Sequence, residues 1–385
     1  MRFESLKIGF LTSGDPRDRR YWSGTPYFMA RALQKQVGEV SFFGPVHPWQ
    51  KIAGKIAGGL SRRLMGKKYD YTHSLGLAKA YAKAFARKLS GQNFDLIVAP
   101  AASTETAFLE TKIPIVYVSD ATFARLVNYY PGFSNLLERS ALQGNEIEHQ
   151  AIQKAALALF SSEWAAASAL NEYAANPARV FVAPFGANLD EIPDEKDALQ
   201  RKKNPVCRLL FLARSWERKG GQIAFQALLT LEETGLAALL VVCGCTPPPG
   251  IFHPWLKVIP SLDKNKADQN RQLTELFLSS DYMLVPTRAD CTPIVFCEAA
   301  AFGLPVITTD TGGVSGVVRN GENGYMLPYY AKGAEYARLI TEIYHDDERY
   351  YKLVRKSRQA FEERLNWDVW ARTVKQLIAE KLGIK

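Results

Sequence analysis

Short apolar runs rich in β-branched residues alternate with helix-patterned stretches along almost the whole chain. Such runs are typical of buried strands, and the stretches between them are long enough for the crossover helices that join parallel strands. The alternation therefore predicts a doubly wound α/β architecture. In the first half the strand-like runs are 8–11, 40–43, 96–99, 115–118, 157–161 and 180–183, and the helix-like stretches are 26–35, 75–89, 133–155 and 163–173.

The alternation is interrupted once, where four Pro and Gly residues frame a charged stretch without periodicity between 184 and 205. A chain of 385 residues is long enough for two domains that each bury a core. We expect an N-terminal Rossmann-like domain over 1–186, a linker over 187–205, a C-terminal Rossmann-like domain over 206–365 and a last helical segment over 366–385. In the second half the strand-like runs are 208–213, 238–243, 256–259, 282–286 and 305–308, and the helix-like stretches are 220–234, 269–279, 296–302, 335–345, 349–365 and 367–381.

The composition limits which classes of binding partner and which cellular compartment we expect. A net charge of +9 favours an anionic binding partner, which can be nucleotide phosphates, an anionic membrane face or nucleic acid. The five cysteines are odd in number and none forms a metal-spaced CxxC pair, so reduced thiols in the cytosol are expected. Neither a signal peptide nor a spanning run is expected. We therefore expect a cytoplasmic protein that can contact the inner membrane face peripherally.

The stretch 282–313, YMLVPTRADCTPIVFCEAAAFGLPVITTDTGG, is the most informative part of the sequence. A strand is expected to end near Pro286, and a helix to begin near Ile294 after a polar loop. The amides of Thr292, Ile294 and Val295 would then form a helix N-terminus, which binds phosphate or polar sugar oxygens through its N–H donors and partial positive charge.

Two carboxylates accompany this expected helix start. Asp290 lies in the loop and Glu298 lies about one turn into the helix. Carboxylates accept paired hydrogen bonds from vicinal hydroxyls, so one can bind a sugar and the other a ribose. The plainer alternative makes Asp290 a turn residue and Glu298 a surface acid.

A second segment, LLFLARSWERKG at 209–220, carries cations across an expected strand-to-helix turn. Arg214 offers a planar fork and Lys219 a mobile point charge, so together they can neutralise a departing diphosphate. The alternative is a solvated basic helix start, which is what we expect for Arg218.

These segments resemble the signature of the family 4 glycosyltransferases, which are retaining enzymes of the GT-B fold. In that signature an acid, seven residues and a Glu precede an A-x-A-x-G-x-P-V-type stretch, matched here by EAAAFGLPV at 298–306. The stretch FVAPFGANLD at 181–190 resembles the element with which the family's linker begins. Two departures stand out: Asp290 replaces the usual Glu, and Cys291-Thr292-Pro293 replaces a glycine-containing loop.

The resemblance implies two facing Rossmann-like domains, of which the N-terminal one binds the acceptor and receives the returning C-terminal helix. It implies that Arg214 and Lys219 bind the donor diphosphate. It places Gly24 in the loop whose backbone approaches the donor phosphate, with Ser23 where a second glycine is frequent. Asp120 stands where many members have a His near the donor sugar, and helix capping is its plainer alternative.

The resemblance further implies a retaining hexosyltransferase. Its donor would be a UDP- or GDP-type sugar, and its acceptor a hydroxyl of a glycan, a glycolipid or a small molecule, in glycan, polysaccharide or glycolipid biosynthesis. The sequence has no P-loop, no GxGxxG after the first strand, no His/Cys cluster and no Asp-x-Asp, so neither a cofactor nor a metal is expected, and nucleic acid is not an expected partner. The alternatives are a sugar-nucleotide epimerase or phosphorylase on the same fold, and a nucleotide-sugar-binding protein that has lost catalysis.

Residues 49–68 combine apolar residues at helical spacing with interleaved Lys and Arg. A basic amphipathic helix of this kind can lie on an anionic bilayer. The ordinary alternative, which we favour slightly, is a surface helix that packs its apolar face on the sheet.

Overall fold

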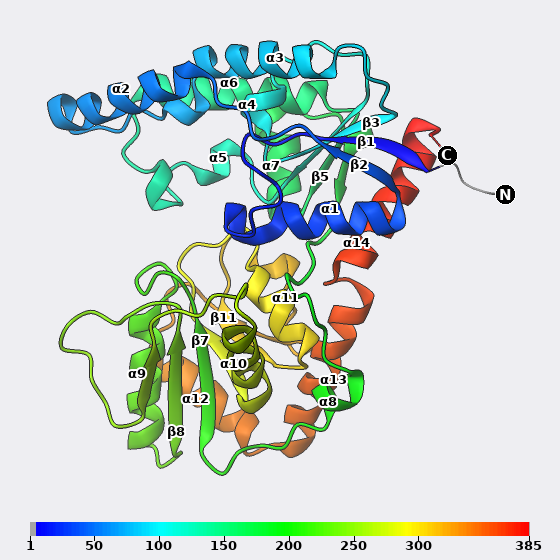
Figure 1. Cartoon of the computed structure of the whole chain (residues 1–385). Helices are drawn as coiled ribbons and strands as arrows, with labels where there is room; N and C mark the ends of the chain where they lie inside the picture. Colours follow the sequence, from blue (N-terminus) through cyan, green and yellow to red (C-terminus); the bar gives the residue numbers. More distant parts are fainter. Residues whose placement is uncertain (1–4, 385) are drawn as a thin grey trace. The chain divides into compact units, whose positions relative to one another are not determined.

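The computed structural model describes residues 5–384, which form two compact units (Figure 1). One unit comprises Met1–Pro184 with Trp367–Lys385, and the other comprises Phe185–Asn366. Each unit contains a six-stranded sheet whose strand pairs are all parallel. The predicted α/β fold class is therefore confirmed.

The first sheet has the order β2-β1-β3-β4-β5-β6. All six strand-like runs of the first half overlap these strands. The helix expected from residue 133 begins at Glu138, after a short 3-10 turn at Pro131–Phe133 and a left-handed Asn135. The strands are β1 (Leu6–Phe10), β2 (Gly38–Phe42), β3 (Leu96–Pro100), β4 (Ile115–Ser119), β5 (Leu157–Phe160) and β6 (Val180–Val182), and the helices are α1 (Thr25–Gln36), α2 (Trp49–Met65), α3 (Leu75–Leu89), α4 (Ser103–Thr106), α5 (Phe123–Leu126), α6 (Glu138–Lys154), α7 (Glu163–Tyr173) and α14 (Trp367–Leu377).

The second sheet has the order β12-β11-β10-β7-β8-β9. Strand β12 was not among the expected strands because it is short and opens with Gly324. That glycine is required by close packing, since a Cβ there would lie 2.1 Å from the carbonyl oxygen of Val306. The strands are β7 (Cys207–Leu212), β8 (Ala238–Cys243), β9 (Leu256–Ile259), β10 (Tyr282–Val285), β11 (Val306–Thr309) and β12 (Gly324–Leu327), and the helices are α8 (Glu195–Leu199), α9 (Gly221–Glu233), α10 (Ala267–Ser279), α11 (Ile294–Ala301), α12 (Gly333–Tyr344) and α13 (Asp347–Glu363).

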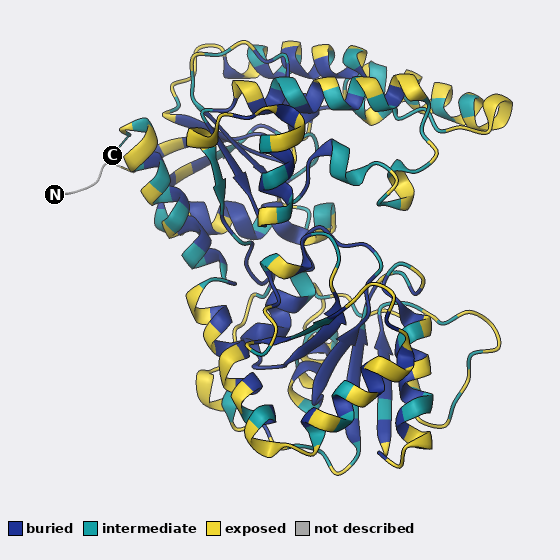
Figure 2. Cartoon of the chain, turned by 180° about the vertical axis from the view of Figure 1, so that it is seen from behind, coloured by how far each residue is buried: buried dark blue, intermediate teal, exposed yellow. Residues whose placement is uncertain are grey.

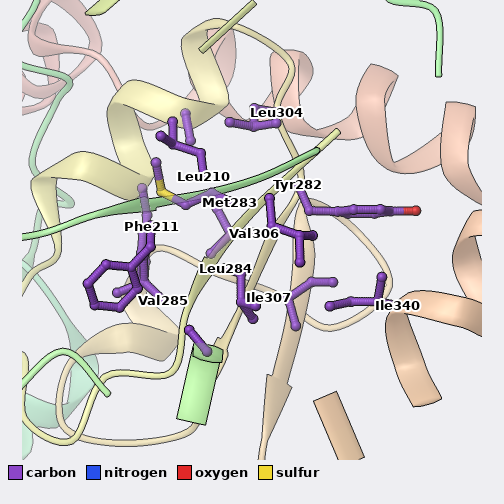
Figure 3. Packing of buried hydrophobic residues seen from close by; sticks show 14 of the residues in the cluster. Leu210, Phe211, Tyr282, Met283, Leu284, Val285, Leu304, Val306, Ile307 and Ile340 are labelled. Carbon is purple, nitrogen blue, oxygen red and sulfur yellow. The ribbon is translucent and has the colours of Figure 1, made fainter. Parts of the chain in front are cut away.

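The core of the second unit is centred on β10, whose four residues are all fully buried. Figure 3 shows Met283 and Val285 packed with neighbours from β7, while Ile307 approaches Ile340 of α12. A strand buried on both faces reads as a continuous apolar run, which is why YMLV was recognisable in the sequence. The buried strands and the exposed outer faces of the helices are seen in Figure 2.

The stretch 187–205, expected as a linker, packs within the second unit and contains α8. The buried guanidinium of Arg201 donates hydrogen bonds to the carbonyl oxygens of Phe277 at 2.9 Å and Phe302 at 2.9 Å. These carbonyls lie at the C-terminal ends of α10 and α11, so one side chain ties both helix ends to the chain that enters the unit.

Helix α14 packs on α1 of the first unit, as the resemblance implied. The ammonium of Lys35 lies 2.5 Å from the carboxylate of Asp368, and Trp370 and Val374 are buried. Among residues 5–384, no helix has the length and apolarity needed to cross a bilayer.

The favoured expectation that residues 49–68 pack an apolar face on the sheet is wrong. Helix α2 has no buried residue. Gly54 and Gly58 face the protein instead, because a Cβ on Gly54 would lie 2.6 Å from the Cβ of Tyr71 and one on Gly58 would lie 3.4 Å from the carbonyl oxygen of Tyr69. These two glycines therefore take the inward position, and the large apolar residues point outward.

Candidate functional site

The candidate site of the second unit lies where its strand order reverses. Strand β7 pairs with β8 on one side and with β10 on the other. Ligands of open α/β sheets bind at the carboxyl ends of the strands at such a switch point. The loop 213–220 after β7 and the loop 286–293 after β10 both leave the sheet there.

Gly220 brings these two loops into direct contact. It adopts a left-handed conformation with φ of 74° as the N-cap of α9, and a Cβ on it would lie 1.9 Å from the carbonyl oxygen of Pro286. Only glycine fits both the dihedral angle and the approach. The backbone N–H of Arg288 also donates to the carbonyl oxygen of Arg218 at 2.8 Å, so the two loops form one rigid edge.

Lys219 and Asp290 meet at this edge. Both side chains are buried, and the ammonium of Lys219 donates a hydrogen bond to Oδ2 of Asp290. The structure thus brings together one cation and one acid that the sequence singled out separately. Because the two opposite charges pair, neither buried charge is left uncompensated. Each loop thus contributes one polar side chain to the edge.

Arg214 and Arg218 have different surroundings from each other. Arg214 lies in the same loop as Lys219 and has an exposed side chain. Arg218 was expected to be a solvated helix start, but its Nη1 donates to the carbonyl oxygen of Ala289 at 2.7 Å. That expectation is corrected, because Arg218 links the two loops by a hydrogen bond. The sequence could not show this, since the acceptor is a backbone atom distant along the chain.

Helix α11 begins at Ile294 with Pro293 as its N-cap, as expected from the sequence. Thr292 is buried, while Ile294 and Val295 are half-buried. The amide of Gly313 donates to the carbonyl oxygen of Asp290 at 3.0 Å, which fixes the loop before the helix. The helix start therefore lies on the same edge as Lys219 and Asp290.

Glu298 is buried in α11 and paired with Lys264, whose ammonium lies 2.5 Å from Oε1. Burial raises the pKa of Glu298, although the charge and hydrogen bond of Lys264 oppose that rise. Lys264 lies between β9 and α10, and the sequence offered no signal for it. The plainer alternative of a surface acid is wrong, because Glu298 is almost completely buried.

Arg288 is a further cation of the edge that the sequence analysis did not single out. Its guanidinium carbon lies 3.5 Å from the ring centroid of Tyr329. Its Nη1 is buried and has no hydrogen-bond partner among the described residues. A buried guanidinium nitrogen without an acceptor is a donor suited to an anionic group.

In the first unit, Gly24 lies at the end of the loop that joins β1 to α1, and Asp120 lies at the carboxyl end of β4. Gly24 is the N-cap of α1 with φ of 84°, and Ser23 is also left-handed with φ of 56°. The backbone therefore keeps a glycine-like conformation at both positions, although only one is glycine. Asp120 follows β4 directly, while the N-cap of the next helix is Thr122 rather than Asp120.

The first unit also contains a buried polar cluster that the sequence analysis missed. Tyr117 donates to Oε1 of Glu148 at 2.9 Å, and Nδ1 of His73 lies 2.7 Å from Oδ2 of Asp70. Burial raises the pKa of Glu148, and likewise that of Glu105. Burial disfavours the charged form of His73, but Asp70 and the two glutamates outweigh it and raise the pKa of His73. Apart from Asp70 and His73, these residues are distant in sequence, so no short motif could reveal the cluster.

The second unit is similar to a known protein family. Residues 193–360 match the family described as glycosyl transferases group 1. The match lies within the second unit and includes both site loops. These findings support a glycosyltransferase.

Two relatives are named D-inositol 3-phosphate glycosyltransferase. The one from Corynebacterium efficiens is 26% identical over 282 residues, covering 69% of this chain and 65% of the relative. The one from Gordonia bronchialis is 24% identical over 238 residues, covering 57% of this chain and 51% of the relative. The chain thus spans between half and two thirds of the length of these relatives.

Two solved structures show the fold over nearly the whole chain. Sucrose-phosphate synthase from Thermosynechococcus elongatus has a TM-score of 0.68 at 15% identity and covers 99% of this chain and 100% of its own. Anabaena HepE in complex with UDP-glucose has a TM-score of 0.62 at 15% identity, covering 98% and 99%. The chain has the GT-B fold, with two Rossmann-like domains.

Proposed function

We propose that this protein is a cytoplasmic, retaining hexosyltransferase that takes its sugar from a UDP-type donor and passes it to a hydroxyl acceptor of a glycan or glycolipid. The donor type draws on the UDP-glucose complex of the structural neighbour HepE. The retaining course, the independence of metal and the role in glycan biosynthesis draw on the sequence resemblance. GDP-type donors and small-molecule acceptors remain outcomes of the test.

One observation carries the proposal: the loops after β7 and β10 are joined at the switch point of the second sheet and carry the Lys219–Asp290 pair beside the start of α11. This is where a diphosphate would meet a cation and a helix N-terminus together. Arg214 and Arg288 add two more cations to the same loops.

The proposed chemistry needs a leaving diphosphate whose growing charge is neutralised. Lys219, Arg214 and the amides of Thr292, Ile294 and Val295 would supply that neutralisation without reorganising during the reaction. Asp290 would accept hydrogen bonds from the sugar hydroxyls while it holds the ammonium of Lys219. Glu298 would bind the ribose hydroxyls, sharing its carboxylate with Lys264.

Two residues of the first unit keep proposed roles. Asp120, at the carboxyl end of β4, would accept a hydrogen bond from a sugar or acceptor hydroxyl and help to remove its proton. Gly24 would allow its backbone to approach a phosphate closely because it has no side chain.

The test is calorimetric titration of the purified protein with UDP, GDP and their sugar conjugates. We expect UDP and a UDP-sugar to bind, and Arg214→Gln to weaken binding roughly tenfold through loss of a charge-assisted hydrogen bond. Arg214 is suited to the test because its side chain is exposed, so the fold should tolerate the change. Lys257→Gln, which removes an exposed cation from β9, should leave affinity unchanged.

Turnover is then followed by NMR with candidate acceptors. An α-linked product from an α-linked donor supports retention. Release, without any acceptor, of a free sugar inverted at one ring carbon would indicate an epimerase instead, and binding without product from any acceptor would indicate a protein that has lost catalysis. Equal affinity of Arg214→Gln and the parent protein would contradict the proposed site.

A further inference from the structure

Helix α2 exposes a row of large apolar side chains to solvent. The exposed fractions are 70% for Trp49, 68% for Ile52, 63% for Ile56, 53% for Leu60 and 78% for Leu64. These residues are three or four positions apart, so they lie on one face of the helix. We call this the α2 apolar face, and the helix carrying it is drawn largely as exposed in Figure 2.

The opposite face of α2 holds the helix to the first unit. Gln50, Gly54, Gly58 and Ser61 are half-buried and recur at helical spacing. Gly54 packs on Tyr71, and the hydroxyl of Ser61 donates to the carbonyl oxygen of Lys67 at 2.9 Å. The orientation of α2 is therefore fixed by packing, and the α2 apolar face is its outward side.

The charge around this face has one sign. No Asp or Glu occurs between Val46 and Tyr69, while the same stretch carries six Lys and Arg residues. Lys55, Arg62 and Arg63 lie on the helix itself and are exposed. Cations that border an exposed apolar face suit a surface that is apolar within and anionic at its rim.

A basic hollow adjoins the beginning of α2. Its volume is about 330 Å³, and its lining includes His47 from the loop before α2, Trp49 from α2, and Lys83 and Arg87 from α3. Three side chains that can carry positive charge surround this space, and Trp49 joins it to the α2 apolar face. A phosphate-bearing headgroup matches the hollow in charge.

We propose that α2 docks the protein on an anionic phospholipid bilayer. The α2 apolar face lies at the boundary of the acyl chains, the flanking cations lie among the headgroups, and the basic hollow receives the phosphate of one lipid. A bilayer fits better than a protein partner, because the centres of protein interfaces are poor in Lys while this face is bordered by cations throughout. The proposal goes beyond sugar transfer and does not depend on it.

The test is cosedimentation of the full-length protein with vesicles in the absence of any nucleotide sugar. We expect binding to vesicles of phosphatidylcholine and phosphatidylglycerol in equal parts, weak binding to pure phosphatidylcholine, and a loss on adding salt. Ile56→Ser combined with Leu60→Ser should weaken binding tenfold or more, and Lys55→Gln combined with Arg62→Gln should weaken it about fivefold per cation.

Phe252→Ser is the matched control, because Phe252 is as exposed as the substituted residues but lies in the second unit. It should leave vesicle binding unchanged. Equal binding by Ile56→Ser/Leu60→Ser and the parent protein would overturn the proposal. So would a dimer in light scattering that these two substitutions dissociate, because a second copy of the chain would then be the occupant of the face. Nucleotide binding is measured separately, so failure here leaves the proposed function standing.

Discussion

At the scale of single residues, the approach of Gly220 to Pro286 determines whether the two site loops can meet. Gly220→Ala should lower the free energy of unfolding by roughly 3 kcal/mol or more, since it combines a left-handed φ with a Cβ inside a backbone carbonyl. Urea denaturation followed by circular dichroism measures the change.

Gly235→Ala separates the two causes. Gly235 also has a left-handed φ, of 83°, but nothing lies within 4 Å of its added Cβ. It should cost about 1 kcal/mol from the dihedral angle alone. Equal losses for the two variants would show that the contact with Pro286 does not constrain the loops.

Glu148 gives a pH dependence whose sign follows from its environment. Burial raises its pKa above the ordinary value of 4.5, so the folded state binds this proton more readily than the unfolded chain. Its contribution to stability is therefore greatest at low pH and declines as the pH rises from 4.5 through the raised pKa. Glu148→Gln, which cannot ionise, should gain stability relative to the parent protein over the same rise.

Denaturation curves at several pH values between roughly 4.5 and 8 provide the measurement. Glu146→Gln is the control, because Glu146 lies on the same helix but is exposed. Its difference from the parent protein should not change over this range. A Glu148→Gln difference that stays flat as well would mean that the carboxyl is not held in a desolvated site.

At the scale of elements, the hydrogen bonds of Arg201 hold the segment 187–205 to the second unit. Replacing Arg201 with Met leaves buried carbonyl oxygens at the ends of α10 and α11 without their donor. Each such acceptor costs about 1–3 kcal/mol, so we expect a loss of several kcal/mol and faster proteolysis within 187–205. Lys202→Met, at the exposed neighbouring position, should change neither quantity.

Some of these elements and contacts could be predicted from the sequence, and others could not. Continuous apolar runs such as 282–285 predicted their strands, because burial on both faces leaves no other pattern. The turn PTRADCTP predicted the start of α11 and the place of Asp290. The orientation of α2, the acceptor of the Arg218 hydrogen bond and the pairing of Lys264 with Glu298 could not be predicted, because each depends on a partner that only the tertiary structure supplies.

At the scale of the whole molecule, we expect each unit to fold from its own chain segments alone. A fragment of residues 185–366 contains all strands of the second sheet and both site loops, so we expect it to unfold cooperatively and to bind UDP. Bound nucleotide should raise its melting temperature by mass action.

A fragment of residues 1–184 lacks α14 and exposes the face of α1 on which α14 packs. We expect it to aggregate, and to become soluble when residues 367–385 are joined to it through a flexible linker. A stable, monomeric 1–184 fragment would contradict a structural role for α14.

The position of α14 has a consequence for biosynthesis. Because the first unit is assembled from segments on either side of the second unit, α14 is synthesised only after the second unit has been translated. During that time α1 still lacks its cover. The interval before α14 emerges is therefore the period in which the nascent chain most needs a chaperone.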